Sequence, residues 1–401
     1  MCSSDLASGH FSMAIPSLST FYLGLTLIVL GTGLLKGNVS VIVGRLYGPQ
    51  DTRRDAGFSI FYMGINLGAF LAPLVCGYLG QRINWHVGFA AAGVGMVLGL
   101  VQYVLGKRHL GAAGLHPAAP WSGSGEGRQG GRVLRAGGAA LLLFVLAAIG
   151  VATGLRPITA AQIAGAAGYL LFGATVAFFG WLFFGGDWTP SERNRLYLIG
   201  VLFLAAALFW SSFEQAGSTL NLFADRSTRT AVLGWEFPSS WFQSVNPLLI
   251  IALAPVFAWM WVRLGRREPS SPTKFGAGLI LVGAGFAVMM AAASWTASGA
   301  RVSPAWLLAT YFLHTVGELA LSPVGLSAMS KLAPARIGGL VMGVWFLASA
   351  VGNYLGGWMA SFYETFPLPT LFGAVAAFGV LAGLLLLSFA RPLRRLMGEV
   401  P

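Results

Sequence analysis

The sequence predicts an all-α, polytopic membrane protein. Hydrophobic side chains make up 56% of the 401 residues, charged side chains only 9%, and the mean hydropathy is +0.72. Soluble domains contain about 25% charged residues, so this composition excludes an ordinary soluble domain. The 55 glycines suit helices that pack closely in lipid, where small residues let two backbones approach each other. We therefore expect a helical bundle.

Apolar runs of helical length set the number of spans. About 20 apolar residues cross a hydrocarbon core of roughly 30 Å, and about eleven such runs can be counted. In order they cover residues 21–44, 57–80, 85–106, 136–153, 160–186, 195–217, 240–263, 274–294, 303–324, 336–360 and 369–390. The stretch 107–135, rich in Gly, Pro, Ala and Ser, is typical of a flexible linker between two helical groups.

The basic residues predict an orientation in the membrane. The net charge is +12, yet most Lys and Arg lie in alternate connections between the apolar runs, a pattern that favours membrane topology over nucleic-acid binding. Arg53, Lys107, Arg193, Arg267 and Arg391 belong to these connections. By the positive-inside rule these connections and the C-terminus are expected to be cytoplasmic. With eleven spans, the N-terminus would then be external.

Three ionisable side chains fall inside apolar runs, and they are the candidate site. Lys36, Glu214 and Glu318 would each cost a few kcal/mol in lipid, so such residues usually face a cavity or a partner. A simpler interpretation is that they form structural ion pairs between helices, and the two roles can coexist. Only the interpretation that they face a cavity predicts a function.

Polar and aromatic residues accompany these charges at helical spacing. They are Tyr62 with Asn66 and Phe70, Trp210 with Phe213 and Glu214, His314 with Glu318, Trp345 with Ser349 and Asn353, and, in another run, Asn246. A lining of ammonium, carboxylate, amide and aromatic groups suits a polar, zwitterionic solute of variable shape. Pro323, beyond Glu318, is expected to weaken its helix, as broken helices at transporter sites do.

Each candidate also has a purely structural interpretation. A single aromatic such as Trp345 is more often a core or lipid-facing residue, and Asn66 and Asn246 could be hydrogen-bond links between helices. His314 is more readily explained as a packed, hydrogen-bonded histidine than as a proton relay. The histidines and cysteines show no zinc-type spacing, and no phosphate-binding or nucleophile-elbow motif occurs, so we expect no metal, no cofactor and no ATP-driven chemistry.

Several segments resemble one transporter family over nearly the whole chain. They are GTGLLKGNVS, RRDAGFSIFYMGINLGAFLAPLVCGYLG, FWSSFEQAGSTL, WFQSVNPL, GELALSPVGLSAMSKLAP and GVWFLASAVGNYLGG. Together they are similar to the proton-coupled oligopeptide transporter (POT) family of the major facilitator superfamily. The resemblance implies a secondary active transporter that imports di- and tripeptides with protons by alternating access, and a place in the bacterial cytoplasmic (inner) membrane.

The resemblance also implies roles for individual residues. Lys36 matches the coupling lysine of the family's fourth helix, Glu214 the glutamate of the seventh, and Glu318 the glutamate of the tenth helix that meets the peptide amino terminus. All three are assigned to proton coupling, and Glu318 to substrate binding as well. The other residues assigned to substrate binding are Tyr62, Asn66, Trp210, Asn246, Trp345 and Ser349.

The resemblance further implies a domain plan and shows departures from it. Residues 1–106 would be the remainder of the N-terminal bundle, 107–135 a cytoplasmic linker, 136–186 two additional helices, and 187–401 the C-terminal six-helix bundle. Gly37 stands where the family usually has proline. No segment matches the E-x-x-E-R-F motif of the family's first helix, so roughly three further helices are expected upstream.

Two alternative functions stay open at this point. A related carrier of the same fold could move another small solute, although the peptide-type Glu318 argues against an anion. A membrane-embedded enzyme could instead use His314 with Glu318 as a general acid and base, but no nucleophile is recognisable near them. Transport is the interpretation that the sequence favours.

Overall fold

The computed structural model describes residues 2–47, 54–111, 113, 159–232, 234–296, 299–334 and 337–396. The chain divides into two compact units, Met1–Ala160 and Ala161–Pro401, and each is described by itself. The predicted span 136–153 lies outside the described residues.

The first unit contains helices α1 to α5. Its elements are α1 (Cys2–Ala14), α2 (Leu18–Arg45), α3 (Arg54–Ala72), a π-helical turn (Pro73–Gly77), α4 (Tyr78–Arg82) and α5 (Trp85–Leu110). Pro73 has no N–H to continue the α-helical ladder, and a shift to a π-helical turn follows at that residue. The predicted run 57–80 is therefore a single span that consists of α3, the π-helical turn and α4.

Helix α1 packs against both α2 and α5. At the crossing of α1 and α2, a Cβ added to Gly24 would lie 2.6 Å from the carbonyl oxygen of Gly9, so only glycine permits this approach. On the other side, Nδ1 of His86 in α5 lies 3.0 Å from the carbonyl oxygen of Met13. Close contacts at glycines and the hydrogen bond of His86 thus join the three helices.

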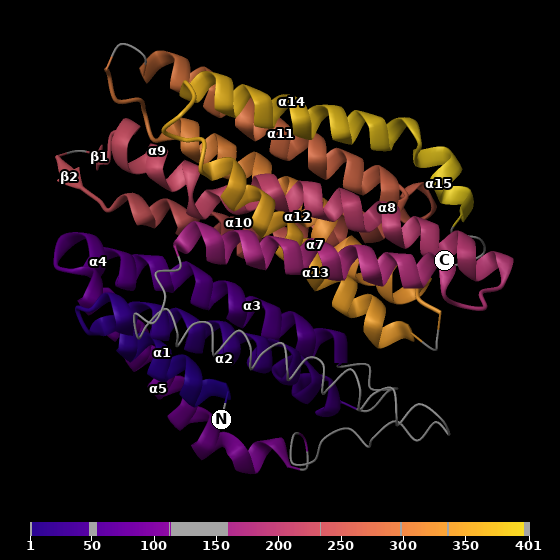
Figure 1. Cartoon of the computed structure of the whole chain (residues 1–401), viewed down its shortest axis with the longest axis horizontal. Helices are drawn as coiled ribbons and strands as arrows, with labels where there is room; N and C mark the ends of the chain where they lie inside the picture. The colour runs from indigo at the N-terminus through magenta and orange to yellow at the C-terminus, as the bar shows by residue number, and fades with distance from the viewer. Residues whose placement is uncertain are drawn as a thin grey trace. The chain divides into compact units, whose positions relative to one another are not determined.

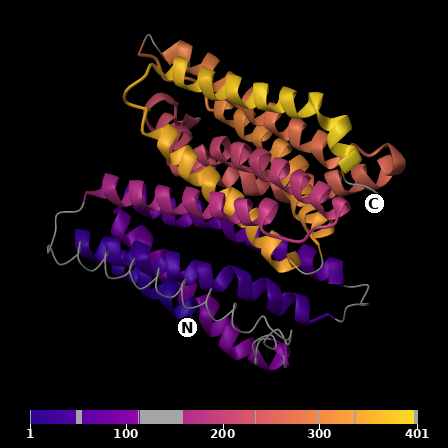
Figure 2. The same cartoon turned by 45° about the vertical axis from the view of Figure 1, so that its right-hand side comes forward.

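The second unit is a larger helical bundle with a short hairpin (Figure 1 and Figure 2). Its elements are α7 (Ala160–Phe184), α8 (Pro190–Phe213), a 3-10 turn (Glu214–Gly217), α9 (Thr219–Ser227), β1 (Ala231–Val232), β2 (Trp235–Glu236), a 3-10 segment (Ser239–Ser244), α10 (Val245–Leu264), a 3-10 turn (Gly265–Arg267), α11 (Ser271–Thr296), α12 (Ala305–Leu332), α13 (Gly338–Ala360), α14 (Leu368–Ser388) and α15 (Ala390–Leu396). Strands β1 and β2 pair antiparallel.

Glycines set the closest helix contacts of this unit. Helix α14 runs along α11 (Figure 1), and a Cβ added to Gly379 would lie 3.0 Å from the Cα of Gly283. Helix α13 lies equally close to α8, because a Cβ added to Gly352 would lie 2.5 Å from the Cβ of Trp210. These contacts hold the helices that carry the candidate site in a fixed register.

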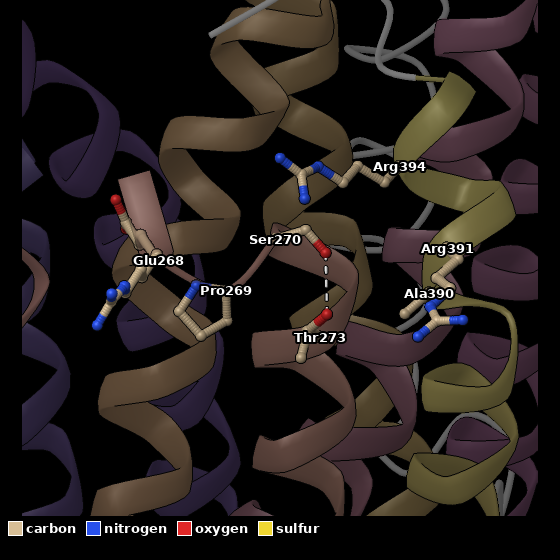
Figure 3. A pocket seen from close by; sticks show the side chains of 8 residues that line it. Glu268, Pro269, Ser270, Thr273, Ala390, Arg391 and Arg394 are labelled. Atoms are coloured by element: carbon tan, nitrogen blue, oxygen red, sulfur yellow. Dashed lines mark hydrogen bonds between the residues drawn. The ribbon is translucent and has the colours of Figure 1, made fainter. Parts of the chain in front are cut away.

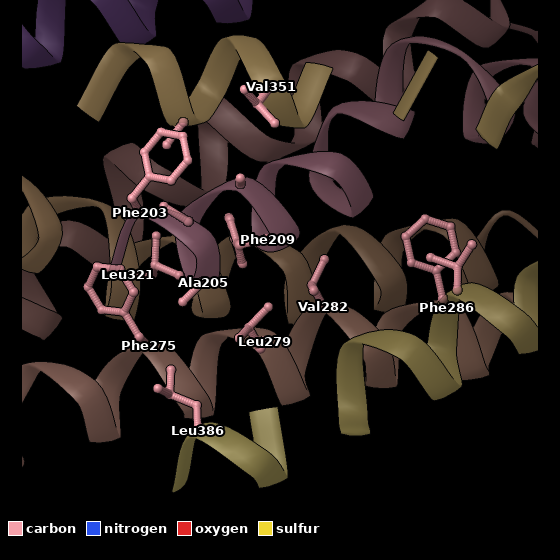
Figure 4. Packing of buried hydrophobic residues seen from close by; sticks show 14 of the residues in the cluster. Phe203, Ala205, Phe209, Phe275, Leu279, Val282, Phe286, Leu321, Val351 and Leu386 are labelled. Carbon is pink, nitrogen blue, oxygen red and sulfur yellow. The ribbon is translucent and has the colours of Figure 1, made fainter. Parts of the chain in front are cut away.

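The interior of the second unit is apolar and well packed (Figure 4). Phe209, Val282, Phe286 and Leu321 have no exposed surface, and Leu279 is 1% exposed. They come from α8, α11 and α12, so the core lies directly beside the helices that carry Glu214 and Glu318.

The structure confirms the predicted fold class. Within the described residues, ten helices are long and apolar enough to span a membrane. They account for every predicted run except 136–153. The expectation at Pro323 is wrong, because α12 continues as an α-helix through that residue. Proline is tolerated inside membrane helices that are packed against neighbours, and α12 packs against α10, α11 and α13.

Candidate functional site

The centre of the candidate site joins α10 to α12 through side chains. The Nδ2 atom of Asn246 donates one hydrogen bond to Oε2 of Glu318 at 2.9 Å and one to Oγ1 of Thr315 at 3.0 Å. Thr315 and Glu318 are three residues apart on α12, so they share one helix face. Asn246 is the second residue of α10. The Asn246 amide therefore binds Thr315 and Glu318 at the same time.

The carboxylate of Glu318 is held in a defined position but remains available. Only 9% of the residue is exposed, and its Oε2 is occupied by Asn246. Within the described part of the chain, Oε1 has no hydrogen-bond partner, and it is not among the fully buried polar atoms. A buried carboxylate with one free oxygen attracts a cation or a proton, because an unpaired charge in an apolar environment is costly.

Thr315 was not predicted from the sequence. Its hydroxyl accepts from Asn246 and donates to the carbonyl oxygen of Tyr311 at 2.7 Å, so it fixes the amide that holds Glu318. The sequence feature that could have indicated Thr315 is its position three residues before Glu318, which places both residues on one helix face.

Glu214 lies where α8 ends. The α-helix stops at Phe213, and Glu214 begins the 3-10 turn that leads into α9. Gln215 bridges this break, since its Nε2 donates to the carbonyl oxygen of Ser211 at 3.2 Å and its Oε1 accepts from Thr219 at 3.0 Å. The prediction placed Glu214 within one continuous span, and the change of helix type is what the structure adds.

Aromatic rings surround this end of α8. The ring centroids of Trp210 and Phe213 are 5.3 Å apart and meet edge to face, and Phe213 lies 6.2 Å from the imidazole of His314. Nε2 of His314 lies 3.1 Å from the carbonyl oxygen of Val282, and the residue is 1% exposed. His314 is thus a packed, hydrogen-bonded histidine in contact with a backbone carbonyl rather than with Glu318.

The α13 candidates differ in their surroundings. Trp345 is only 5% exposed, its ring lies 6.3 Å from that of Phe275, and it covers Gly325, where an added Cβ would lie 2.3 Å from the indole. The carbonyl oxygen of Ser349 accepts a hydrogen bond from Asn353 at 3.0 Å. A pocket-lining role for Trp345 and Ser349 stays a prediction.

The remaining candidates belong to the first unit. Asn66 in α3 is 6% exposed and donates from Nδ2 to the carbonyl oxygen of Tyr62 at 3.0 Å, whereas the Tyr62 side chain is 42% exposed. Lys36 belongs to α2, and its side chain lies outside the described residues. The meeting of these three residues with Glu318 stays a prediction.

The described residues contain no group of three His, Cys, Asp or Glu side chains that could hold a metal ion. What the site offers chemically is a carboxylate with one free oxygen, amide groups and aromatic faces. Such groups suit the binding of a charged polar solute, and among the described residues of the site none is arranged as a nucleophile with its base.

Comparison with known proteins gives a consistent result. The POT family matches residues 3–118 and 187–377. Over 98% of its length the chain is 42% identical to the peptide transporter YePEPT of Yersinia enterocolitica, of which it covers 79%, and 34% identical to a di-/tripeptide transporter of Lactococcus lactis subsp. cremoris, of which it also covers 79%.

Solved structures agree with these relatives. A crystal structure of a POT peptide transporter in complex with sulfate matches with a TM-score of 0.88 and 42% identity, covering 99% of this chain and 80% of that one. A POT family transporter in complex with 5-aminolevulinic acid matches with a TM-score of 0.88 and 31% identity, covering 98% and 80%. The chain therefore belongs to the POT family of transporters.

Proposed function

We propose that this protein is a secondary active transporter that carries di- and tripeptides across the bacterial cytoplasmic membrane together with protons. Its membership of the POT family and its relatives named as peptide and di-/tripeptide transporters support this function. One observation carries the proposal: Asn246 holds the Glu318 carboxylate through Oε2, and Oε1 has no hydrogen-bond partner among the described residues.

Glu318 recognises the amino terminus of the peptide. Every unmodified peptide has an ammonium group, whatever its side chains, and a charge-assisted hydrogen bond to a carboxylate is about twice as strong as a neutral one. Asn246 holds this carboxylate and Thr315 fixes the Asn246 amide, so the carboxylate need not reorganise when the ammonium arrives. Asn66 and Asn246 supply amide groups for the peptide backbone.

The aromatic residues take the variable part of the substrate. Large aromatic surfaces, which do not require a particular hydrogen-bond geometry from the substrate, come from Tyr62, Trp210 and Trp345. Ser349 adds a small polar group. Aromatic surface of this kind accommodates different side chains at low entropic cost. One carrier can therefore accept many di- and tripeptides.

Proton coupling rests on Lys36, Glu214 and Glu318. Each changes charge on protonation, and a charge within the membrane strongly favours one arrangement of helices over another. Glu214 lies at the break between α8 and α9, where a change of charge could alter the helix geometry.

Lipid solvates the outer helix faces, and the cationic connections and the C-terminus face the cytoplasm.

We assign the segments of the chain to the domains that other members of the POT family have. Residues 1–106 belong to the N-terminal bundle, 107–135 to the linker, 136–186 to two additional helices and 187–401 to the C-terminal bundle that contains Glu318.

The second candidate function is transport of another amine. The structure of a 31% identical relative in complex with 5-aminolevulinic acid favours this candidate. That compound also has an amino group that a carboxylate could bind.

The experiment is uptake of a labelled dipeptide into liposomes that contain the purified protein. An imposed inward proton gradient should drive accumulation, and a protonophore should abolish it. Labelled 5-aminolevulinic acid, tested in the same way, distinguishes the second candidate. Equal accumulation with and without the gradient would contradict proton coupling, and absence of dipeptide uptake under either condition would contradict the substrate class.

A further inference from the structure

A pocket separate from the candidate site opens where the connection between α10 and α11 meets α15 (Figure 3). Its volume is about 310 Å³. The lining residues that matter here are Arg267, Glu268, Ser270, Thr273, Arg391 and Arg394. Figure 3 shows Arg394 extending from α15 over Ser270, with Arg391 on the same helix. Three arginines, Arg267, Arg391 and Arg394, thus line one concave surface.

The pocket carries an uncompensated positive charge. Its acidic side chain, Glu268, is already paired with the ammonium of Lys274, which is 5% exposed and also lies 3.9 Å from the ring centroid of Trp261. In the described part of the chain, no carboxylate pairs with Arg267, Arg391 or Arg394. Within the described ranges, three arginines without a paired carboxylate therefore line this concave surface, and guanidinium groups are well suited to anions with several oxygens.

Hydroxyl and backbone groups complete the wall opposite the arginines. Oγ of Ser270 and Oγ1 of Thr273 are 2.9 Å apart, and both line the pocket. The 26-residue helix α11 begins at Ser271. Pro272 has no N–H and the N–H of Lys274 donates to the carbonyl oxygen of Ser270, so the N–H groups of Ser271 and Thr273 and the positive end of the dipole lie at the same place. Guanidinium, hydroxyl and N–H donors together match the oxygens of a phosphate group.

The pocket lies at a membrane boundary. The span Ser239–Leu264 ends just before it, Ser271–Thr296 begins beside it, and Leu368–Ser388 ends next to α15. Large apolar side chains are exposed in the last two turns of α10, Trp259 (59%) and Val262 (83%), and at the end of α14, Leu385 (62%) and Phe389 (55%). An occupant with a phosphate head and apolar tails would contact both surfaces.

From this arrangement we propose that the pocket binds the headgroup of an anionic phospholipid. Arg267, Arg391 and Arg394 contact the phosphate, the hydroxyl of the Ser270–Thr273 pair that does not donate within the pair donates to a phosphate oxygen, and the acyl chains lie along the exposed apolar side chains of α10 and α14. A bound lipid then links the α10–α11 connection to α15. The proposal does not depend on the transported substrate or on which side of the membrane the pocket faces.

The test measures the melting temperature of the purified protein in a neutral detergent. Short-chain phosphatidylglycerol should raise it, whereas phosphatidylcholine and inorganic phosphate at the same concentration should not. The triple variant Arg267→Gln, Arg391→Gln, Arg394→Gln should lose the shift. Apparent lipid affinity should fall about fivefold for each arginine removed.

The matched control is the double variant Arg229→Gln, Arg301→Gln. Both residues are exposed and lie outside the pocket, so this variant should keep the full shift. Should the triple variant not fold, the single variants Arg391→Gln and Arg394→Gln are compared with Arg391→Lys and Arg394→Lys, which keep the charge.

Two results would overturn the proposal. Retention of the full phosphatidylglycerol shift by the pocket variants would show that the lipid binds elsewhere. An equal shift with inorganic phosphate in the wild-type protein would show a simple anion site without a role for lipid. Since neither readout involves uptake, failure here is distinguishable from failure of the proposed transport function.

Discussion

Glu318 illustrates how a single charged residue can be accommodated within an apolar span. Asn246 donates to one of its oxygens, the other has no partner in the part of the chain that the structure describes, and Thr315 fixes the amide. A carboxylate supported in this way is already positioned for an incoming ammonium. The supporting residues should therefore affect affinity even where they do not contact the substrate.

Replacement of Thr315 tests this support. Thr315→Val keeps the shape and removes the hydroxyl that accepts from Asn246, so dipeptide affinity should fall about fivefold, as expected for the loss of roughly 1 kcal/mol of hydrogen bonding. Thr315→Ser keeps the hydroxyl and should bind nearly as well as the wild type. Calorimetric titration of both variants with one dipeptide measures the difference, and equal affinities for the two would contradict the proposed support.

Lys36 provides a test of coupling at the same scale. Lys36→Ala should abolish gradient-driven uptake of a dipeptide while leaving exchange of peptide across the membrane partly intact, because a charge that couples to protons is lost rather than the pocket. Gradient-driven uptake and counterflow, measured in the same liposomes, separate the two effects. Normal uptake under a proton gradient would show that Lys36 is not a coupling residue.

The individual helices show what a sequence can and cannot reveal. The spans were predictable because lipid leaves the backbone no partner except itself, so every apolar run of sufficient length becomes a helix. The 3-10 turn at Glu214 was not predictable, since the turn depends on contacts of Gln215 and Thr219 with neighbouring turns. The same limit applies to Trp345, whose burial against Gly325 depends on the register between α12 and α13.

That register can be tested by overpacking. An added Cβ at Gly325 would lie 2.3 Å from the Trp345 ring and 2.9 Å from Phe275, so Gly325→Ala should destabilise the second unit by about 1–3 kcal/mol. Gly343→Ala on α13 is the matched control, because nothing lies within 4 Å of the added atom. The melting temperature should fall for the first variant only. An unchanged value for Gly325→Ala would mean that α12 and α13 are not packed as described.

At the scale of the whole molecule, charge asymmetry predicts orientation. The hairpin of β1 and β2 and the helix α15 lie at opposite ends of spanning helices, and only the connections on the α15 side are strongly basic. By the positive-inside rule we expect α15 to be cytoplasmic and the hairpin to be external. The roles of Glu318, Asn66 and Asn246 could be proposed from the sequence, but Thr315 required the three-dimensional pairing of α10 with α12.

Thiol labelling tests the orientation. In a protein whose Cys2 and Cys76 are replaced by serine, Glu236→Cys should react with a membrane-impermeant reagent in intact cells. Arg395→Cys should react only after the membrane is permeabilised. The reverse pattern would contradict the topology.

The central claim is that Glu318 binds the amino terminus of a peptide, and one measurement tests it most directly. Affinities for a dipeptide and for its N-acetylated form are compared in the wild-type protein, in Glu318→Gln and in the control Glu236→Gln on the hairpin. The wild type and the control should prefer the free amine by roughly 10- to 100-fold, the equivalent of about 1.5–3 kcal/mol for a charge-assisted contact. Glu318→Gln should lose this preference by weakening only the free amine. Retention of the full preference by Glu318→Gln would contradict the account.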